Sequence, residues 1–254
     1  MAKRNTPLVP GEFYHIYNRG NSKQVVFLDD HDRERFVHLL YICNSDKNFK
    51  YRDDIVRAGI NPWEYVQGEQ LVSIGAWVLM PNHFHLYLTE PCTDLVGAES
   101  EEDVHRGGIS LFMAKLSKAY AQYFNTKYSR TGSLFEGKFK SVHVNTDEQA
   151  KYLFSYIHLN PVKLIQKDWK TEGIKNKQEA LRFLEGYKWS SFVDYNKANR
   201  PENKIINQEN FPDYFSEIGD FENEIFDWLN DSAPTWSGQG FNTSVALQSK
   251  QPYA

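Results

Sequence analysis

Two histidines separated by one residue, His83 and His85, are the first candidates for chemistry in this chain. From His83 to Thr89, polar and apolar residues alternate with a period of two, which predicts a half-buried β-strand. Both imidazoles then lie on one face of a rigid strand, where their ring nitrogens can hold a single metal ion. The same residues also fit a pair of solvated or hydrogen-bonded strand histidines, and the motif alone leaves both interpretations open.

A helix with tyrosines and an asparagine on one face is the second candidate. Residues 149–160 predict a helix, because a capping-box sequence precedes them and a proline follows them. Tyr152, Tyr156 and Asn160 are spaced by four residues and therefore lie on the same face. A phenol within reach of a metal-bound phosphodiester can act as a nucleophile and form a covalent phosphotyrosine. A divalent ion on two imidazoles needs at least one more ligand, and Asn160 offers a side-chain oxygen.

Cations interleaved with aromatic residues form the third group of candidates. In the segment 128–144 the cations suit phosphates and the aromatic faces suit unpaired bases, as single-stranded nucleic acid requires. A solvated edge strand whose lysines guard against strand pairing explains the same residues. The candidate DNA-binding residues are Lys115, Lys118, Arg130, Phe135, Lys138, Phe139 and Lys140.

Hydrophobic periodicity and turn residues predict the elements that must position these side chains. The expected strands lie near 12–17, 72–80 and 83–89, with one more at the end of the segment 128–144. The expected helices lie near 30–43, 109–124 and 149–160. Residues 44–69 are polar and irregular, which indicates an insertion. Residues 196–254 are acidic and aromatic and contain one candidate helix, at 213–228.

The composition indicates a globular protein of a reducing compartment. No apolar run approaches the ~18 residues that cross a bilayer, and the N-terminus lacks the apolar region of a signal peptide. Two cysteines are too few for a disulfide framework. The net charge of −4 argues against a nucleic-acid partner. That charge is uneven, however: residues 201–254 carry nine acids and two lysines, which leaves the first 200 residues at +3, and a second acidic stretch lies at 94–103.

At these motifs the sequence resembles a known family. Met80-Pro-Asn-His-Phe-His85 resembles the His-hydrophobic-His (HUH) motif. Tyr156-Ile-His-Leu-Asn-Pro-Val-Lys163 resembles the signature of single-tyrosine HUH transposases, in particular the REP-associated tyrosine transposases. Further blocks match in the same order, at His15–Gly20, Gly132–Ser141 and Trp189–Phe192. The resemblance covers roughly residues 11–195, and ordered blocks are far more specific than any one of them.

The resemblance implies a ferredoxin-like α+β fold, with an antiparallel sheet that carries the histidines and helices on one face of it. We expect a catalytic domain over 1–195, with insertions at about 44–69 and 93–108, followed by an acidic C-terminal extension over 196–254. A cytoplasmic, nucleoid-associated monomer or homodimer is expected.

The implied activity is that of a transposase and endonuclease. Such an enzyme cuts and rejoins single-stranded DNA at or near palindromic or hairpin repeats through a 5′-phosphotyrosine, with Mg²⁺ or Mn²⁺ as cofactor. Carried over residue by residue, Tyr156 is the nucleophile, His83 and His85 are metal ligands, and Asn160 is the third ligand. The insertions and the acidic extension have no counterpart in the family core, and they leave oligomeric state and DNA specificity open.

Two other functions compete with this one. A metal-dependent hydrolase would need an acid or base near the metal, and neither motif contains a carboxylate. A catalytically idle DNA-binding descendant has no physical need to keep Tyr156, His83 and His85 together. His158 is two residues from Tyr156 and points roughly 200° away around the helix, so a structural role is expected for it.

Overall fold

The computed structural model of the protein describes residues 7–91, 107–196, 199–212 and 225–226. The predicted acidic loop at 94–103 lies outside these residues, and so does most of the candidate helix at 213–228. Within the described ranges, none of the helices is both long enough and apolar enough to span a bilayer.

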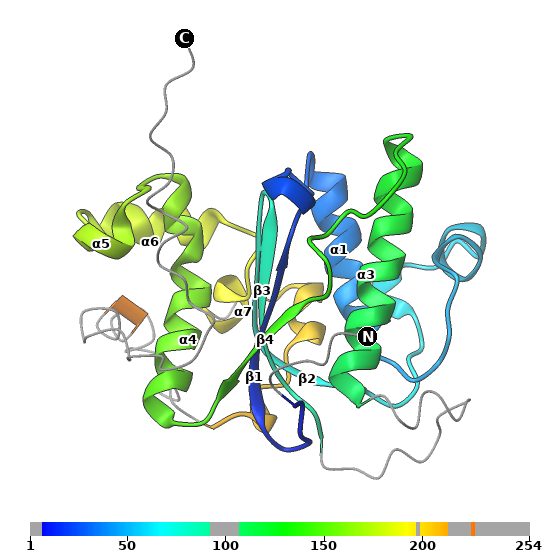
Figure 1. The fold of residues 1–254 in the computed structure, drawn as a ribbon, viewed down its shortest axis with the longest axis horizontal. Coiled ribbons are helices and arrows are strands. Elements are labelled where there is room, and N and C mark those ends of the chain that lie inside the picture. The colour runs from blue at the N-terminus through cyan, green and yellow to red at the C-terminus, as the bar shows by residue number, and fades with distance from the viewer. Residues whose placement is uncertain (1–6, 92–106, 197–198, 213–224, 227–254) are drawn as a thin grey trace.

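A four-stranded antiparallel sheet lies at the centre of the molecule (Figure 1). Its strands are β1 Phe13–Arg19, β2 Ser73–Met80, β3 His83–Thr89 and β4 Lys140–Val144. They are arranged in the order β2-β3-β1-β4, which makes β2 and β4 the two edges. One helix follows β1 and another follows β3, so the chain has the βαββαβ order of the ferredoxin-like fold. The predicted α+β class is confirmed.

Two helices pack against one face of the sheet: α1, Asp30–Ile42, and α3, Gly108–Lys127 (Figure 1). A capping box starts α1, where the Asp32 N–H donates to the Asp29 carboxylate at 2.9 Å. Alternate residues of β3 join these helices in one buried cluster. That cluster includes Phe84, Leu86, Leu88, Phe36, Leu40, Phe112, Leu116 and Tyr120.

The opposite face is covered by α4, Asp147–Leu159, which begins where the Gln149 N–H donates to the Thr146 hydroxyl at 3.2 Å. A second buried cluster joins this helix to β2, and it includes Ala76, Val78, Met80, Leu153 and Ile157. β2 is apolar on both of its faces, which is the pattern of a strand covered twice. The expectation of helices on one face therefore needs correction, because both faces are covered. The polar face of β3 is buried as well, and the strand is not half-solvated.

Short helices and an extended segment complete the α4 side of the molecule. The helices are α5 Trp169–Glu172, α6 Lys177–Gly186 and α7 Phe192–Tyr195. After them Arg200 forms a two-pronged ion pair with Asp194, at 2.7 and 2.6 Å. Phe211 packs on Tyr87 of β3 with ring centroids 4.9 Å apart. Residues 199–212 are thus packed against the domain, while the boundary expected at residue 195 stays a prediction.

The predicted insertion at 44–69 has little regular structure but is firmly attached. It contains one wide helical turn, Tyr51–Arg57, and a short turn at Pro62–Glu64. The buried Asn44 side chain donates to Val72 O at 2.8 Å and accepts from the N–H groups of Leu71 and Val72, at 3.0 and 2.9 Å. These bonds hold the insertion to the strand that follows it.

Candidate active site

A cluster of histidine and tyrosine rings lies between the sheet and α4. His85 of β3 is paired in register with Tyr17 of β1, and the two rings are 5.7 Å apart. His15 lies two residues before Tyr17 on the same strand, and its ring stacks on that of His85 at 5.0 Å. The Tyr156 ring approaches His85 edge-on at 5.4 Å. We refer to His15, Tyr17, His83, His85 and Tyr156 as the ring cluster.

Asn82 sets the tautomer of His83. The Asn82 amide nitrogen donates to Lys23 O at 3.1 Å, which turns the amide oxygen toward the imidazole. That oxygen lies 2.6 Å from Nδ1 of His83, so Nδ1 carries the proton and donates it. The other nitrogen, Nε2, is left with a lone pair, which is the form of histidine that binds metal ions.

His15 is the hydrogen-bond partner that orients the ring of His85. Nε2 of His15 and Nδ1 of His85 are 2.8 Å apart, so one hydrogen bond joins the two rings. Nε2 of His85 is buried and has no hydrogen-bond partner among the described residues. When His85 is the donor to His15, this buried Nε2 holds an unused lone pair in a site that excludes water. A hydrogen bond on the second nitrogen is the usual support of a metal-binding histidine.

Burial keeps these imidazoles neutral. Desolvation lowers the pKa of both His15 and His83 to about 3, and the nearby Lys170 acts in the same direction on each. The pKa of His85 lies well below its usual value, because the ring is buried and has His15 and His83 beside it. All three rings therefore present lone pairs rather than positive charge at neutral pH.

The hydroxyl of Tyr156 is held by Lys170 and lies next to Asn160. The Lys170 ammonium, contributed by α5, donates to it at 2.9 Å and lies 4.1 Å from the centre of its ring. Burial raises the pKa of Tyr156, whereas the hydrogen bond to the Asn160 side chain and the charge of Lys163 lower it. The residue is only 6% exposed, so its hydroxyl is fixed rather than solvated.

Lys170 is an exposed residue overall, and its ammonium end donates to the hydroxyl of Tyr156. Desolvation of this end lowers the lysine pKa to about 8. Sequence reasoning missed both Lys170 and His15. The alternation in β1 places His15 on the face of Tyr17, and only pairing with β3 brings it to His85. The sequence carries no signal for Lys170, because α5 is a four-residue helix.

Tyr152 lies one helical turn before Tyr156, and the two rings are parallel, with centroids 6.3 Å apart and an angle of 6°. The Tyr152 ring is half-buried against the second core. Lys170 donates to the hydroxyl of Tyr156. Of the two candidate tyrosines, Tyr156 therefore belongs to the ring cluster.

His158 and Asn160 lie on different sides of the same chain segment. His158 is fully buried in the second core, with its Nε2 2.7 Å from the Ser191 hydroxyl, in agreement with a structural role. Asn160 is 2% exposed and follows α4 directly, next to the Tyr156 hydroxyl.

The predicted metal ligands fit a divalent ion only as a mixed set. Among the described residues, no three His, Cys, Asp or Glu side chains come together as a metal site. The predicted set has two histidines and one asparagine instead. Its fit rests on the buried, unpartnered Nε2 of His85 and on the fixed tautomer of His83. Asn160 would add an amide oxygen.

The candidate DNA-binding residues separate into different places. Lys138 and Lys140 are exposed, and Lys140 is paired in register with Tyr17 of the ring cluster. Phe139 is half-buried against the first core, and Arg130 lies over the Phe124 ring at 5.5 Å. Phe135 is 5% exposed and meets Phe84 edge-on at 5.8 Å, so its ring packs in the core and is not available to a base.

The two lysines of α3 lie across the sheet from Tyr156. Lys115 donates to the carbonyls of Ser45 and Lys47, so its ammonium fastens the insertion to α3. Lys118 is exposed, one helical turn farther on. The structure therefore brings neither lysine to the ring cluster.

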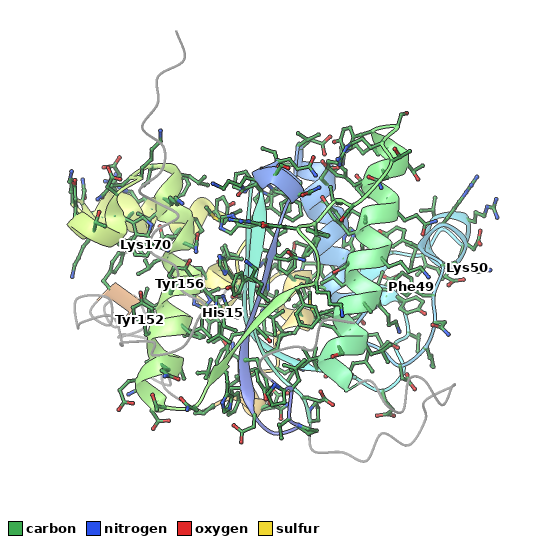
Figure 2. All side chains as sticks on the ribbon, in the orientation of Figure 1. His15, Phe49, Lys50, Tyr152, Tyr156 and Lys170 are labelled. Carbon is green, nitrogen blue, oxygen red and sulfur yellow. The ribbon has the colours of Figure 1, made fainter. Side chains whose placement is uncertain are left out.

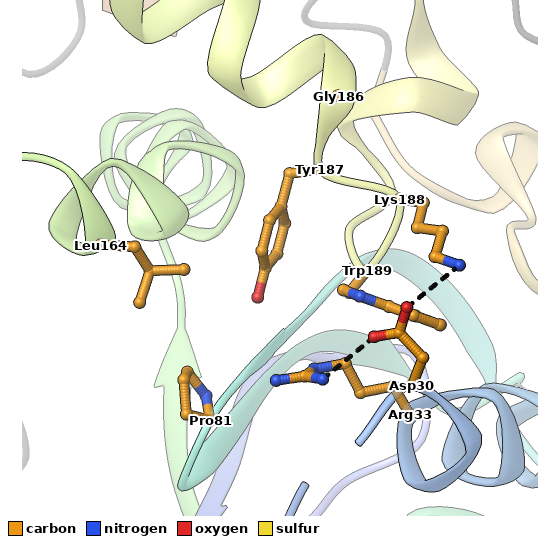
Figure 3. Close-up of a pocket in the computed structure, with 8 residues that line it drawn as sticks. All are labelled: Asp30, Arg33, Pro81, Leu164, Gly186, Tyr187, Lys188 and Trp189. Carbon is orange, nitrogen blue, oxygen red and sulfur yellow. Dashed lines mark hydrogen bonds and ion pairs between the residues drawn. The ribbon is translucent and has the colours of Figure 1, made fainter. Parts of the chain in front are cut away.

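A hollow of about 370 Å³ lies beside the turn between β2 and β3 (Figure 3). Pro81, Leu164, Tyr187 and Trp189 form much of its wall. Its two cations share one carboxylate, because Asp30 pairs with Arg33 at 3.2 Å and with Lys188 at 3.5 Å. The charged side chains of this hollow therefore leave one net positive charge.

Comparison with known proteins shows a distant similarity to solved structures. No family model and no curated protein matches the chain. Among solved structures the chain is similar to a REP-associated tyrosine transposase bound to a REP hairpin, with 14% identity and a TM-score of 0.43. The match covers 87% of this chain and 95% of that one. A likeness of this strength carries no argument about activity.

Proposed function

We propose that this protein cuts and rejoins single-stranded DNA, with Tyr156 as the nucleophile and a divalent metal ion on His83, His85 and Asn160. The observation that carries the proposal is the setting of the Tyr156 hydroxyl. It accepts from Lys170 at 2.9 Å and lies next to Asn160, beside a histidine whose Nε2 is buried and unpartnered. The hydroxyls of Tyr120, Tyr187 and Tyr195 donate to backbone carbonyls, whereas a cation donates to the oxygen of Tyr156.

In the reaction, the Tyr156 oxygen attacks the phosphorus of a DNA phosphodiester. A bond forms between phosphorus and the tyrosine oxygen, the bond to the 3′-oxygen breaks, and the 3′-oxygen takes up a proton to become a hydroxyl. The DNA 5′-phosphate is then attached to the protein as a phosphotyrosine. Attack by a 3′-hydroxyl reverses these changes and rejoins the strand.

The chain's own residues account for most of the positioning. Tyrosine is a weak nucleophile at neutral pH, with an ordinary pKa of ~10, so its hydroxyl must be oriented before it reacts. Lys170 donates to the oxygen on which negative charge develops as the proton leaves, which stabilises the phenolate. Mg²⁺ or Mn²⁺, when bound, would act as a Lewis acid on the scissile phosphate. Asn82 and His15 hold the two histidines in the orientation that such an ion needs.

Two rival functions are less well supported. A hydrolase that activates water would need an acid or base beside the metal, and neither the His83–His85 motif nor the Tyr156–Lys163 motif contains a carboxylate. An idle DNA-binding protein leaves the Lys170–Tyr156 contact without a purpose. A covalent adduct distinguishes the proposal from both rivals.

The test is to incubate the protein with single-stranded DNA that contains palindromic repeats, in Mg²⁺ and separately in Mn²⁺, and to map any covalent adduct by mass spectrometry. We expect DNA on Tyr156 in the wild-type protein and no adduct at all in Tyr156→Phe. Tyr152→Phe is the matched control, because it removes the same hydroxyl one turn away, and it should keep the adduct. DNA attached to Tyr152, or no adduct with any single-stranded substrate, would overturn the proposal.

A further inference from the structure

A second and larger hollow lies on the other side of the molecule, between the insertion and α3. Its volume is about 720 Å³. Figure 2 shows Phe49 and Lys50 of this region beyond α3, whereas Tyr156 and Lys170 lie across the sheet. Its lining includes three aromatic rings, Phe49, Tyr51 and Tyr123, and six cations, Arg35, Lys50, Arg52, Lys115, Lys118 and Lys127. We refer to this surface as the basic hollow.

Four of the six cations of the basic hollow lack acidic partners among the described residues. Of the other two, Lys127 pairs with Asp29 and Asp32, and Lys115 binds backbone carbonyls. Asp53 also lines the hollow, but its carboxylate pairs with Arg57 at 2.6 Å. Arg35, Lys50, Arg52 and Lys118 form no ion pair within the described ranges. Like charges gathered in a concave surface repel one another and raise the local positive potential. Their placement on one concave surface therefore favours the binding of an anion.

Arg35 is held in a position suited to phosphate. Its guanidinium lies over the Tyr51 ring at 3.6 Å and over the Tyr123 ring at 4.5 Å. Stacking on two aromatic faces orients the planar group and leaves its N–H edge for a ligand. A guanidinium fixed in this way binds phosphate oxygens through two parallel hydrogen bonds.

The wall of the basic hollow is fixed in place. Lys115 binds two carbonyls of the insertion, and the Gly68 N–H donates to the Ser45 hydroxyl at 2.8 Å. Trp63 is packed into the first core and its carbonyl accepts from Lys204 at 2.7 Å. A ligand therefore meets a preformed surface and needs little further ordering of the chain.

We propose that the basic hollow binds the phosphate backbone of the DNA substrate, away from the phosphodiester that Tyr156 attacks. A small anion could use two of the cations, whereas four unmatched cations around a half-buried phenylalanine suit a longer strand with bases and phosphates. The inference rests on the proposed function, because it takes DNA as the substrate. It assigns the insertion a role in holding DNA while the ring cluster cleaves it.

The test removes two cations from the hollow and compares the result with the loss of two cations elsewhere. Lys50→Gln/Arg52→Gln is measured against Lys188→Gln/Arg182→Gln, whose exposed side chains lie outside the basic hollow and its wall. All proteins carry Tyr156→Phe, so that binding is measured without cleavage. We expect the hollow variant to bind a labelled single-stranded oligonucleotide about tenfold more weakly at 0.1 M salt, with a salt slope smaller by about 1.4. The control variant should bind as the parent protein does.

Arg35→Lys is a second variant, which keeps the positive charge but loses the planar guanidinium stacked between Tyr51 and Tyr123. Lys118→Gln is a third variant, which removes an exposed charge from α3. Both should weaken binding if the hollow holds DNA phosphates. Unchanged DNA affinity and salt slope in all the hollow variants would overturn the inference. The same holds if these variants lose affinity for inorganic pyrophosphate alone, because the hollow is then a small-anion site.

Failure of the inference is distinguishable from failure of the proposed function. If the hollow variants bind DNA normally while the protein with Tyr156 intact still forms its adduct, only the inference fails. If no adduct forms with any substrate, the proposed function fails, whatever the hollow variants bind.

Discussion

On β3, neighbouring residues face two very different environments. Phe84 points into a cluster of aromatic and aliphatic side chains under α1 and α3, and its ring packs on Phe36 at 5.0 Å. His85, the next residue, points to the α4 side and is hydrogen-bonded to His15. Both side chains are almost completely buried. Burial thus stabilises apolar packing on one face of the sheet. On the other face it keeps polar side chains uncharged and fixed in orientation.

The difference has a physical cost and a physical benefit. Apolar side chains gain free energy when they leave water, so the α1–α3 face stabilises the fold. Buried imidazoles lose hydration, and His85 leaves one nitrogen unpartnered. In return the rings stay neutral, and Tyr156 is held with its hydroxyl on Lys170. A face of the sheet where polar groups are buried at a cost in stability is therefore a candidate functional site.

Substitution of these two neighbours is the strongest test of the comparison. Phe84→Ala should lower the free energy of unfolding by about 3–5 kcal/mol, because it leaves a cavity in the first core. His85→Ala should abolish the DNA adduct, with a smaller loss of stability, of about 1–2 kcal/mol for the hydrogen bond to His15. Denaturant unfolding and adduct yield, measured on the same preparations, check both expectations.

Chelation provides the control for the metal. EDTA should abolish adduct formation by the wild-type protein and leave most of its DNA affinity, since cations on the surface supply that affinity. Undiminished adduct in EDTA would remove the metal assignment of His83, His85 and Asn160. Full adduct formation by His85→Ala would show that the α4 face is only a second core.

The same comparison shows what could be predicted from the sequence. Alternation in β3 and the capping residue of α1 are local signals, and the structure agrees with both. Coverage of the second face depends on β2 being apolar on both sides, which alternation within β3 cannot reveal. Phe135 was grouped with lysines because they are neighbours in sequence, but the segment around it is bridged to Gly20 and its ring enters the core.

The candidate site was predictable only where its residues share an element. Tyr156 and Asn160 are one turn apart on the chain, and His83 and His85 share a strand. His15 and Lys170 reach the same point from β1 and α5, through tertiary pairing that has no local signature. For this reason the sequence predicts His85 and Tyr156 as site residues but does not predict His15 and Lys170, which orient them.

Lys170 tests whether the α4 face orients the nucleophile or simply encloses it. Lys170→Met keeps much of the side-chain length and removes the donor to Tyr156, so the adduct should form roughly 100-fold more slowly. DNA affinity in a Tyr156→Phe background should change little, because one cation is only one of several phosphate contacts. Lys170→Arg retains a donor and should restore part of the rate. Equal losses in rate and in affinity for Lys170→Met would make Lys170 a phosphate ligand and not a positioning residue.

Substitution of Lys140 and Lys138 tests whether DNA reaches the ring cluster across the β4 edge of the sheet. β4 is an edge strand, and Lys140 lies opposite Tyr17 in the register with β1, so its side chain shares a face with the cluster. A strand of DNA that reaches Tyr156 past this edge would meet Lys140 before Lys138. Lys140→Gln should therefore weaken single-strand binding by roughly three- to fivefold and lower the salt slope by about 0.7, the value for one phosphate contact. Lys138→Gln should have a smaller effect. If neither substitution changes the slope, but the double variant aggregates, the lysines only guard the exposed edge of the sheet against pairing with another strand.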